Sequence, residues 1–543
     1  MQVWCKIIKT VALYKFSENE KPMKQFSSDH PSNEESLSAG EKRESIGYKA
    51  LVDRYNLQVI PHFRWSFLIC KGSRRVLLDR SPHVYLYDQG YALDNPESPL
   101  EQLAFALKHE GLNLEIIKAF FEKISVSQVT LYVQERYTGK YERMIWYLYE
   151  SMTQQILAIP DLEKGSYIDL LDDEIYYTGK AAPQTRHRIN DNLLGNFSFC
   201  PFVRKTDLLK TIEAKKLDLI VRQMLQEYDQ TIIERASNFL YAQETMSSYQ
   251  IEHERPNKQR LARFIELIKK TENITTLTKE TVVELQSNIV EDRFANSDYR
   301  TTQNYVGQSQ DWYRQIIHFI SPKPNDVPDL MDGLFKALNR MLLNKENPFV
   351  TAATIAFGFV FIHPFDDGNG RLHRFLIHYI LHRTSFTPPK IAFPISATIL
   401  LNMKLYTNAL ELFSKQLMPL ITDYELNEQG EMSVLGKTDT FYRFIDYTAQ
   451  TEFLAQCVEK TIHTDFKNEL IYLARYDQAK EKIQNIVDMP DRLISLFIAV
   501  TTKNNGILSQ NKRVTHFSML TDNEVRQMEE IIKQLFFSTH ITD

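Results

Sequence analysis

The stretch FIHPFDDGNGRLHR, at residues 361–374, gathers side chains that could do chemistry within a few positions. His363 has an unperturbed pKa of about 6.5, so it can accept a proton near neutral pH. Gly368 and Gly370 allow a backbone with positive φ to approach an anion closely. Arg371 and Arg374 add two cations three positions apart. A base, a glycine turn and two cations together indicate a site for phosphate groups.

The residues on either side predict that this stretch is a loop between two helices. The preceding segment, NPFVTAATIAFGFVFI, is nearly all apolar, which is typical of a buried helix. In the following segment, RLHRFLIHYILHR, apolar residues recur at helical spacing. The loop therefore ends at a helix N-terminus, where free N–H groups and the helix dipole favour anions. Two arginines at that end are electrostatically unfavourable without an anion, so a polyphosphate ligand is expected.

The adjacent aspartates, Asp366 and Asp367, need a separate explanation because they would repel a polyphosphate. A carboxylate that holds Mg²⁺ between two phosphates becomes part of the binding site instead. We therefore expect Mg²⁺ at this loop. The base, the metal carboxylate and the phosphate cradle together indicate transfer of a group from a nucleotide to a hydroxyl.

The same residues resemble a known family. HPFDDGNGRLHR matches the Fic motif, H-x-F-x-[D/E]-G-N-G-R-x-x-R, at every defined position. The segments YRTTQNYVG and HFISPKPNDVP, at residues 299–307 and 318–328, resemble the segments that precede this motif in Fic proteins, the second being flap-like. The resemblance extends from about Glu244 to Ile421, and RHRINDNLLGNFSFCP and MPDRLISLF are similar to parts of larger bacterial Fic proteins.

The resemblance implies a protein adenylyltransferase, which transfers AMP from ATP to a Ser, Thr or Tyr hydroxyl of a target protein. It assigns His363 as the base and Asp367 as the Mg²⁺ ligand. Phe365 is implied to be a buried anchor, and we expect Asp366 to be a solvated carboxylate. For Tyr406 a place near the adenine and a place in the core stay open. The implied nucleotide-binding residues are Gly368, Asn369, Gly370, Arg371 and Arg374, with Arg374 reaching the γ-phosphate.

Fic proteins often contain an inhibitory helix, [S/T]-x-x-x-E-[G/N], whose glutamate pairs with the second arginine of the motif. Ser248 and Glu252 fit this pattern in part, with His253 where the family has Gly or Asn, and Ser287 with Glu291 fits it less well. We favour Glu252, because with Ile251 just before it the stretch resembles the SSxIEGE form that is common in the family. A carboxylate bound to Arg374 would occupy the anion site and exclude the γ-phosphate. The resemblance leaves open that the same glutamate positions a water molecule for removal of AMP.

The composition of the chain indicates the number of domains and the fold class. The chain has 543 residues, of which 43% are hydrophobic and 24% charged, so two to four domains are expected. Glycine is scarce and long helix-forming runs dominate, which predicts a mainly α fold. The net charge of −5 gives no global argument for nucleic acid or membrane. Widely spaced cysteines favour a reducing cytoplasm, no apolar run reaches the roughly 18 residues of a membrane span, and no signal peptide is evident.

We divide the chain into five parts. The Fic-type part is expected to be a multi-helix domain with a small β-hairpin flap. The parts are a disordered N-terminal tail (1–47), a mostly helical N-terminal domain (48–235), a Fic domain with the inhibitory helix (236–421), a linker and helical connector (422–488) and a winged-helix-like module (489–543).

The terminal module leaves two roles open, contact with DNA or with protein. A nucleotide-sensing, DNA-binding transcriptional regulator is the alternative function, although a sensor has no need of His363. A homodimer and a secreted, host-directed effector also stay open. Within the second motif helix, His378 and His382 are four residues apart; we expect exposed helix residues there rather than a metal pair.

Overall fold

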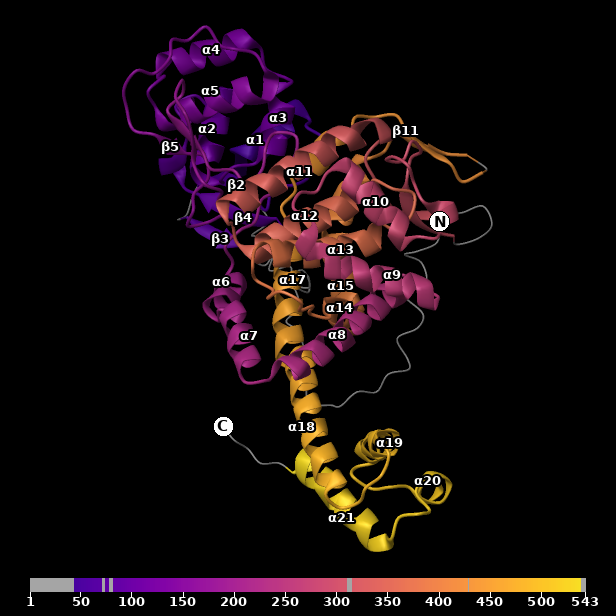
Figure 1. Cartoon of the computed structure of the whole chain (residues 1–543). Coiled ribbons are helices and arrows are strands. Elements are labelled where there is room, and N and C mark those ends of the chain that lie inside the picture. Colours follow the sequence, from indigo (N-terminus) through magenta and orange to yellow (C-terminus); the bar gives the residue numbers. More distant parts are fainter. Residues whose placement is uncertain (1–42, 71–73, 78–81, 310–314, 428, 539–543) are drawn as a thin grey trace.

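Helices make up most of the chain and form three units along it, drawn in indigo, in magenta to orange, and in yellow (Figure 1). The computed structural model describes residues 43–70, 74–77, 82–309, 315–427 and 429–538. Each unit has its own apolar core. The predicted mainly α fold class is therefore confirmed. Among the described helices, none is long and apolar enough to cross a membrane.

The N-terminal unit packs five helices beside two small sheets. The first sheet has the order β1-β2-β4-β3, in which only β2 and β4 are parallel, and the second has the order β5-β7-β6. The buried rings of Trp146, Tyr149 and Phe120 lie in its core. Its elements are β1 (Arg43–Ile46), α1 (Tyr48–Tyr55), β2 (Arg64–Ile69), β3 (Arg75–Leu77), β4 (His83–Tyr87), α2 (Pro99–His109), α3 (Leu114–Phe121), α4 (Val126–Glu135), α5 (Lys140–Thr153), β5 (Ile168–Asp169), β6 (Ala182–Gln184) and β7 (Ile189–Asp191).

Ordered structure begins earlier than the sequence predicted. Residues 1–42 of the predicted tail lie outside the described residues, but residues 43–46 form β1, which pairs with β2. Ile46 is buried with Leu68, Tyr87 and Phe105, and this contact explains why the segment is part of the unit.

The central unit is built around α12, whose side chains are all buried from Phe349 to Ile362. Helices α11, α13 and α17 pack against it. The helices of this unit are α6 (Asp207–Ala214), α7 (Leu217–Gln226), α8 (Gln230–Ile251), α9 (Lys258–Lys269), α10 (Lys279–Ile289), α11 (Val327–Asn344), α12 (Pro348–Ile362), α13 (Asn369–Arg383), α14 (Ile395–Leu401), α15 (Met403–Leu417), α16 (Asp439–Arg443), α17 (Thr448–Thr461) and the first part of α18 (Lys467–Gln484).

The boundaries of this unit differ from those expected at residues 235 and 421. Leu209 and Val221, on α6 and α7, belong to the central core, and so do Phe453 and Leu470 on α17 and α18. Apolar faces on both sides of the Fic segment therefore complete its core. The resemblance alone did not reveal this, because these helices lie before and after the segment from Glu244 to Ile421 over which it extends.

Two hairpins stand beside the motif loop. The antiparallel pair β8 (Tyr305–Ser309) and β9 (Gln315–Ile320) is the β-hairpin expected as a flap. A second antiparallel pair, β10 (Tyr424–Leu426) and β11 (Met432–Val434), lies within the predicted linker. Gln303 forms an isolated bridge with Met432, so the second hairpin adjoins the residues leading into the flap.

The C-terminal unit sits at the far end of a long helical rod (Figure 1). Helix α17 continues through a π-helical turn at Ile462–Phe466 into α18. The unit consists of α19 (Asp491–Thr502), α20 (Gln510–His516) and α21 (Asp522–Ile532), with a capping box at Thr521 and Glu524 as expected. No strand occurs in the described residues 489–538, so the wing of a winged helix is missing from that segment.

Two glycines allow a loop of the N-terminal part to dock on the central helices. A Cβ on Gly358 of α12 would lie 2.6 Å from Cζ of Phe199, and one on Gly333 of α11 would lie 2.7 Å from Cβ of Ser198. Phe199 is fully buried. This close approach seats the loop directly behind the helix that ends at the motif.

We expect Gly358→Ala to destabilise the protein by about 1–3 kcal/mol, because the added methyl group overpacks the contact with Phe199. In an open helix position the same substitution would stabilise by about 0.5–1 kcal/mol, so the sign of the effect is informative. Chemical denaturation measures it. Leu343→Ala on α11, where the side chain is 83% exposed, is the control and should change stability little. A Gly358→Ala protein as stable as the parent would contradict the contact.

Candidate active site

The motif forms the predicted loop between α12 and α13. Asn369 closes this loop with its side chain: Oδ1 accepts from the Phe365 amide at 3.1 Å, and Nδ2 donates to the Phe365 carbonyl at 2.7 Å. Phe365 is fully buried, as expected for an anchor. Gln286 of α10, which is fully buried, donates to the Asp367 carbonyl at 3.1 Å. The Asn369 side chain therefore shapes the loop, while the backbone N–H groups at the start of α13 stay available to a ligand.

His363 is the last residue before the loop and adopts a left-handed backbone, with φ 52° and ψ 60°. Its Nδ1 lies 3.1 Å from the Val360 carbonyl. Because a carbonyl can only accept, Nδ1 holds the proton and Nε2 is left as the acceptor. Burial lowers the pKa of His363 to about 4, against the hydrogen bond to Val360 that raises it. The imidazole is therefore neutral at physiological pH, as a general base must be.

Arg300 is a positioning residue that the sequence analysis missed. Its Nε donates to the His363 carbonyl at 2.7 Å and its Nη1 to the Thr302 carbonyl at 2.8 Å. Its amide donates to the Pro364 carbonyl at 2.9 Å. Arg300 is only 3% exposed, and one side chain thus ties the base of the flap to the backbone of the histidine. A single arginine in YRTTQNYVG gave no sequence signal for this role.

The two aspartates have different surroundings. Oδ1 of Asp367 accepts from the Gly368 amide at 2.6 Å and from Nη2 of Arg371 at 2.8 Å. Asp366 is exposed, but Asn296 donates to its Oδ2 at 2.7 Å, so it is held rather than free in solvent. Within the described ranges, no cluster of three or more His, Cys, Asp or Glu could hold a metal ion by itself.

Arg374 lies at the centre of a contact between distant parts of the chain. It is 1% exposed, and its Nε donates to Oγ of Ser248 at 2.8 Å. Its Nη2 donates to the Ser248 carbonyl at 2.9 Å and to Oε1 of Glu252 at 2.7 Å. The structure thus brings together the serine, the glutamate and the second motif arginine. The other candidate, Glu291, contacts Arg293 and Arg260 instead.

Gly370 makes room for Glu252. A Cβ at this position would overlap Oε1 of Glu252 and would lie 3.0 Å from its Cδ. A larger residue would push the carboxylate away from the start of α13. The glycine therefore serves the contact with Glu252, in addition to any approach of the backbone to a ligand.

The end of α8 forms a Schellman motif that places Glu252. The amide of Glu254 donates to the Tyr249 carbonyl at 3.0 Å, and the amide of His253 donates to the Gln250 carbonyl at 2.9 Å. His253 has a φ of 57°, in the left-handed region where glycine is favoured. This geometry gives a physical reason for the Gly or Asn that the motif has at this position.

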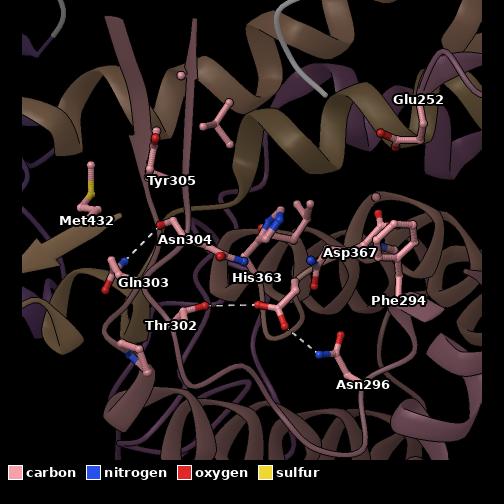
Figure 2. Close-up of a pocket in the computed structure, with 18 of the residues that line it drawn as sticks. Glu252, Phe294, Asn296, Thr302, Gln303, Asn304, Tyr305, His363, Asp367 and Met432 are labelled. Carbon is pink, nitrogen blue, oxygen red and sulfur yellow. Dashed lines mark hydrogen bonds between the residues drawn. The ribbon is translucent and has the colours of Figure 1, made fainter. Parts of the chain in front are cut away.

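The motif loop from Asp366 to Arg371 lines a pocket of about 1450 Å³ together with His363 and Glu252. Figure 2 shows His363 in its wall, with Glu252 on one side and Asn304 and Tyr305 on the other. Tyr406 also lines the pocket, is only 5% exposed, and packs against Phe357. Burial raises its pKa to about 12, so it is a neutral hydrogen-bonding group. It is thus both a core residue and a wall of the pocket.

The histidine pair on α13 differs from the expectation of exposed residues. His378 is 8% exposed, and its Nε2 lies 2.8 Å from Oε1 of Glu244. His382 lies 3.3 Å from Glu272, on a different segment. Each histidine therefore has a carboxylate neighbour of its own, because α8 and the segment after α9 cover this face of α13.

Residues 276–381, from just before α10 to the end of α13, match the model of the Fic/DOC family. This part of the chain is therefore a Fic domain. The expectation drawn from HPFDDGNGRLHR is confirmed for this part of the chain.

Curated relatives share the same region. The chain is 38% identical over 85 residues to "Protein adenylyltransferase Fic" of Nematostella vectensis, which is 15% of this chain and 20% of that protein. It is 32% identical over 114 residues to the protein of the same name from Drosophila grimshawi, which is 21% of this chain and 22% of that protein. The match thus spans about a fifth of the length of these relatives.

Solved structures give similarities of low score. A Fic domain containing signaling protein from Bacteroides thetaiotaomicron aligns with 20% identity and a TM-score of 0.29, covering 49% of this chain and 91% of that one. A Fic family protein from Desulfovibrio desulfuricans aligns with 16% identity and a TM-score of 0.32, covering 59% of this chain and 87% of that one.

We expect His363 to stay neutral from pH 8 down to pH 5.5, because its pKa is lowered to about 4. The unfolded chain takes up this proton near pH 6.5, so the group favours unfolding as the pH falls below that value. NMR of protein with ¹³C-labelled histidine, with the signal assigned through His363→Asn, measures the titration. A midpoint near 6.5 would contradict the buried, neutral base.

Replacing His253 by glycine should make the cap at the end of α8 more stable. The left-handed backbone costs a non-glycine residue about 1 kcal/mol, which glycine does not incur. We expect hydrogen exchange at residues 253 and 254 to slow by about threefold. Lys345→Gly, at the left-handed end of α11 (φ 56°), is the matched control and should leave these two amides unchanged. Faster exchange in His253→Gly would count against the Schellman cap.

Proposed function

We propose that this protein is an adenylyltransferase, which transfers AMP from ATP to a Ser, Thr or Tyr hydroxyl of a target protein. The observation that supports this best is the meeting of a neutral His363 with the first turn of α13 at one pocket. That turn presents free N–H groups and has Arg371 on it, with Arg374 on the next turn. The names of the relatives point to the same reaction.

In the proposed reaction, Nε2 of His363 takes the proton from the target hydroxyl. The hydroxyl oxygen then forms a bond to the α-phosphorus of ATP. The bond from that phosphorus to the β-phosphate oxygen breaks, and pyrophosphate leaves. The products are a protein with AMP on its hydroxyl and pyrophosphate. Arg300 holds the left-handed backbone at His363, which fixes the imidazole at the start of the motif loop.

The nucleotide would be held by the start of α13. The backbone of Gly368, Asn369 and Gly370 would cradle the α- and β-phosphates, and Arg371 and Arg374 would hold the phosphate tail. Asp367 fits a Mg²⁺ site, because one carboxylate beside substrate phosphates is a usual ligand set for that ion. When bound, Mg²⁺ would neutralise charge on the phosphates. Tyr406 would lie beside the adenine.

The contact between Glu252 and Arg374 would keep the transferase activity low. Ser248 and Glu252 occupy Nε and Nη2 of the buried arginine, so its guanidinium cannot pair with the γ-phosphate through two donors while they are in place. A charge-assisted pair of this kind is strong when it is shielded from water. The same carboxylate could position a water molecule for removal of AMP, so the test below includes the reverse reaction.

The alternative of a DNA-binding regulator has less support. The C-terminal unit has an adjacent basic pair, Lys512 and Arg513, but Arg513 donates to the Leu520 carbonyl and lies 3.2 Å from Asp522. One of the two cations is thus used inside the C-terminal unit. The chemistry at the pocket does not depend on whether this unit contacts DNA or protein, or on whether the chain forms a homodimer.

We expect Glu252→Gly to increase labelling of protein by ATP labelled at the α-phosphate, by tenfold or more, since coupling between competing ligands spans about 5–150-fold. His363→Ala in the same background should abolish labelling while ATP still binds. A cell lysate serves as the source of targets, and mass spectrometry identifies the modified residue. Loss of AMP from the labelled protein on adding the unaltered chain would reveal the reverse reaction.

Glu291→Gly is the matched control, because Glu291 ends a neighbouring helix but contacts neither motif arginine. It should leave labelling unchanged, and activation by it alone would refute the choice of Glu252. ATP binding without labelling in Glu252→Gly would favour a nucleotide sensor over a transferase.

A further inference from the structure

We propose that Glu254 is a second inhibitory carboxylate, which occupies Arg371 as Glu252 occupies Arg374. One helix cap would then block both arginines of the phosphate site. This inference rests on the proposed function, because it assumes that these arginines bind the phosphates of a nucleotide.

Arg371 and Glu254 form a bidentate ion pair. Arg371 is 1% exposed, with its Nη2 3.1 Å from Oε1 of Glu254 and its Nη1 3.2 Å from Oε2. Nη2 also pairs with Asp367 at 2.8 Å, and Nη1 donates to the Ile289 carbonyl at 3.3 Å. Both terminal nitrogens are thus committed. The remaining donor, Nε, is buried and has no hydrogen-bond partner among the described residues.

The two pairs join the start of α13 to the cap of α8. Arg371 and Arg374 are three residues apart in the first two turns of α13, so both lie at the same end of the helix. Glu252 and Glu254 flank the left-handed residue of the Schellman motif that ends α8. The reversal of the chain at that residue lets two carboxylates from one cap reach two arginines. Any movement of the cap would act on both pairs together.

Charge explains why Glu254 would oppose a nucleotide. In this state Glu252, Glu254 and Asp367 pair with the two motif arginines, and Arg260 also pairs with Glu254, so the positive charge at the phosphate site is already neutralised. A polyphosphate entering it would meet carboxylates at short range and in surroundings poor in water. When the cap leaves, the two arginines outnumber the one remaining carboxylate, and the site becomes favourable for phosphate.

Arg260 gives Glu254 a second partner. Its Nη2 donates to Oε2 of Glu254 at 2.9 Å, and its guanidinium lies over the ring of Tyr249, 5.2 Å from the centroid. Glu254 is partly exposed (30%), whereas the two arginines are almost fully buried. The carboxylate can therefore leave Arg371 without losing all of its pairing. The ion pair between Glu254 and Arg371 is therefore easier to break than an ion pair whose loss would leave a buried charge without a partner.

The two inhibitory carboxylates should affect different phosphates. Arg374 is the residue expected at the γ-phosphate, so Arg371 is left for the nearer phosphates that ADP shares with ATP. Removal of the Glu254 charge should then tighten the binding of ADP as well as ATP. Affinity for ADP is a readout that does not depend on transfer of AMP.

The test is the dissociation constant of ADP with Mg²⁺, measured by titration calorimetry on the full chain. We expect Glu254→Gln to lower this constant by about tenfold, within the range usual for coupled sites. Glu254→Asp, which keeps the charge but shortens its reach, should give part of that gain. Glu254→Ala provides a second neutral variant in case the glutamine variant does not fold.

Glu291→Gln is the matched control, since it removes a carboxylate near Arg260 that does not touch Arg371. It should leave the affinity for ADP unchanged. An unchanged affinity in both neutral Glu254 variants would overturn the proposal, and a weaker one would show that Glu254 instead orients Arg371 for the phosphate. If ADP binds more tightly but no variant labels protein, the second carboxylate stands and the transferase function fails.

Discussion

The structure of this site depends on two buried arginines at the N-terminus of a helix. Arg371 and Arg374 are each 1% exposed, and they lie where the free N–H groups of α13 already favour negative charge. A buried guanidinium without an anion is costly, so some carboxylate or phosphate must be there at all times. In this structure the anions are Glu252 and Glu254, supplied by the cap of α8. The rest of the domain holds this cap against the motif loop.

Several elements around the pocket hold the motif loop and the cap of α8 in place. The apolar helix α12 and the buried Phe365 fix the loop from behind, and Asn369 closes it. Arg300 joins the loop to the flap, and Gln286 joins it to α10. Glu244, two turns before Glu252 on α8, accepts from the Ser396 amide at 2.7 Å, which secures α8 to α14. The same packing that places His363 therefore also places the carboxylates that pair with the motif arginines.

Sequence alone predicted the parts of the site that are local in the chain. The motif residues are contiguous, and the apolar patterns on both sides fixed the loop between two helices. Glu252 was found because its spacing from Ser248 is itself a local pattern. Arg300, Gln286 and Glu254 were missed because their partners are brought close only by folding. The same reason explains His378, whose burial depends on α8, and the core residues of α6, α7 and α17, which lie outside the recognisable segment.

In the proposed regulation, the cap carboxylates and a polyphosphate compete for the same two arginines. The most direct measurement compares the affinities of ATP and adenosine for the unaltered chain and for a chain with both Glu252→Gln and Glu254→Gln. Competition for the arginines predicts that ATP binds more tightly to the substituted chain, while adenosine, which has no phosphate, binds equally to both. Equal shifts for the two ligands, or no shift for ATP, would contradict it.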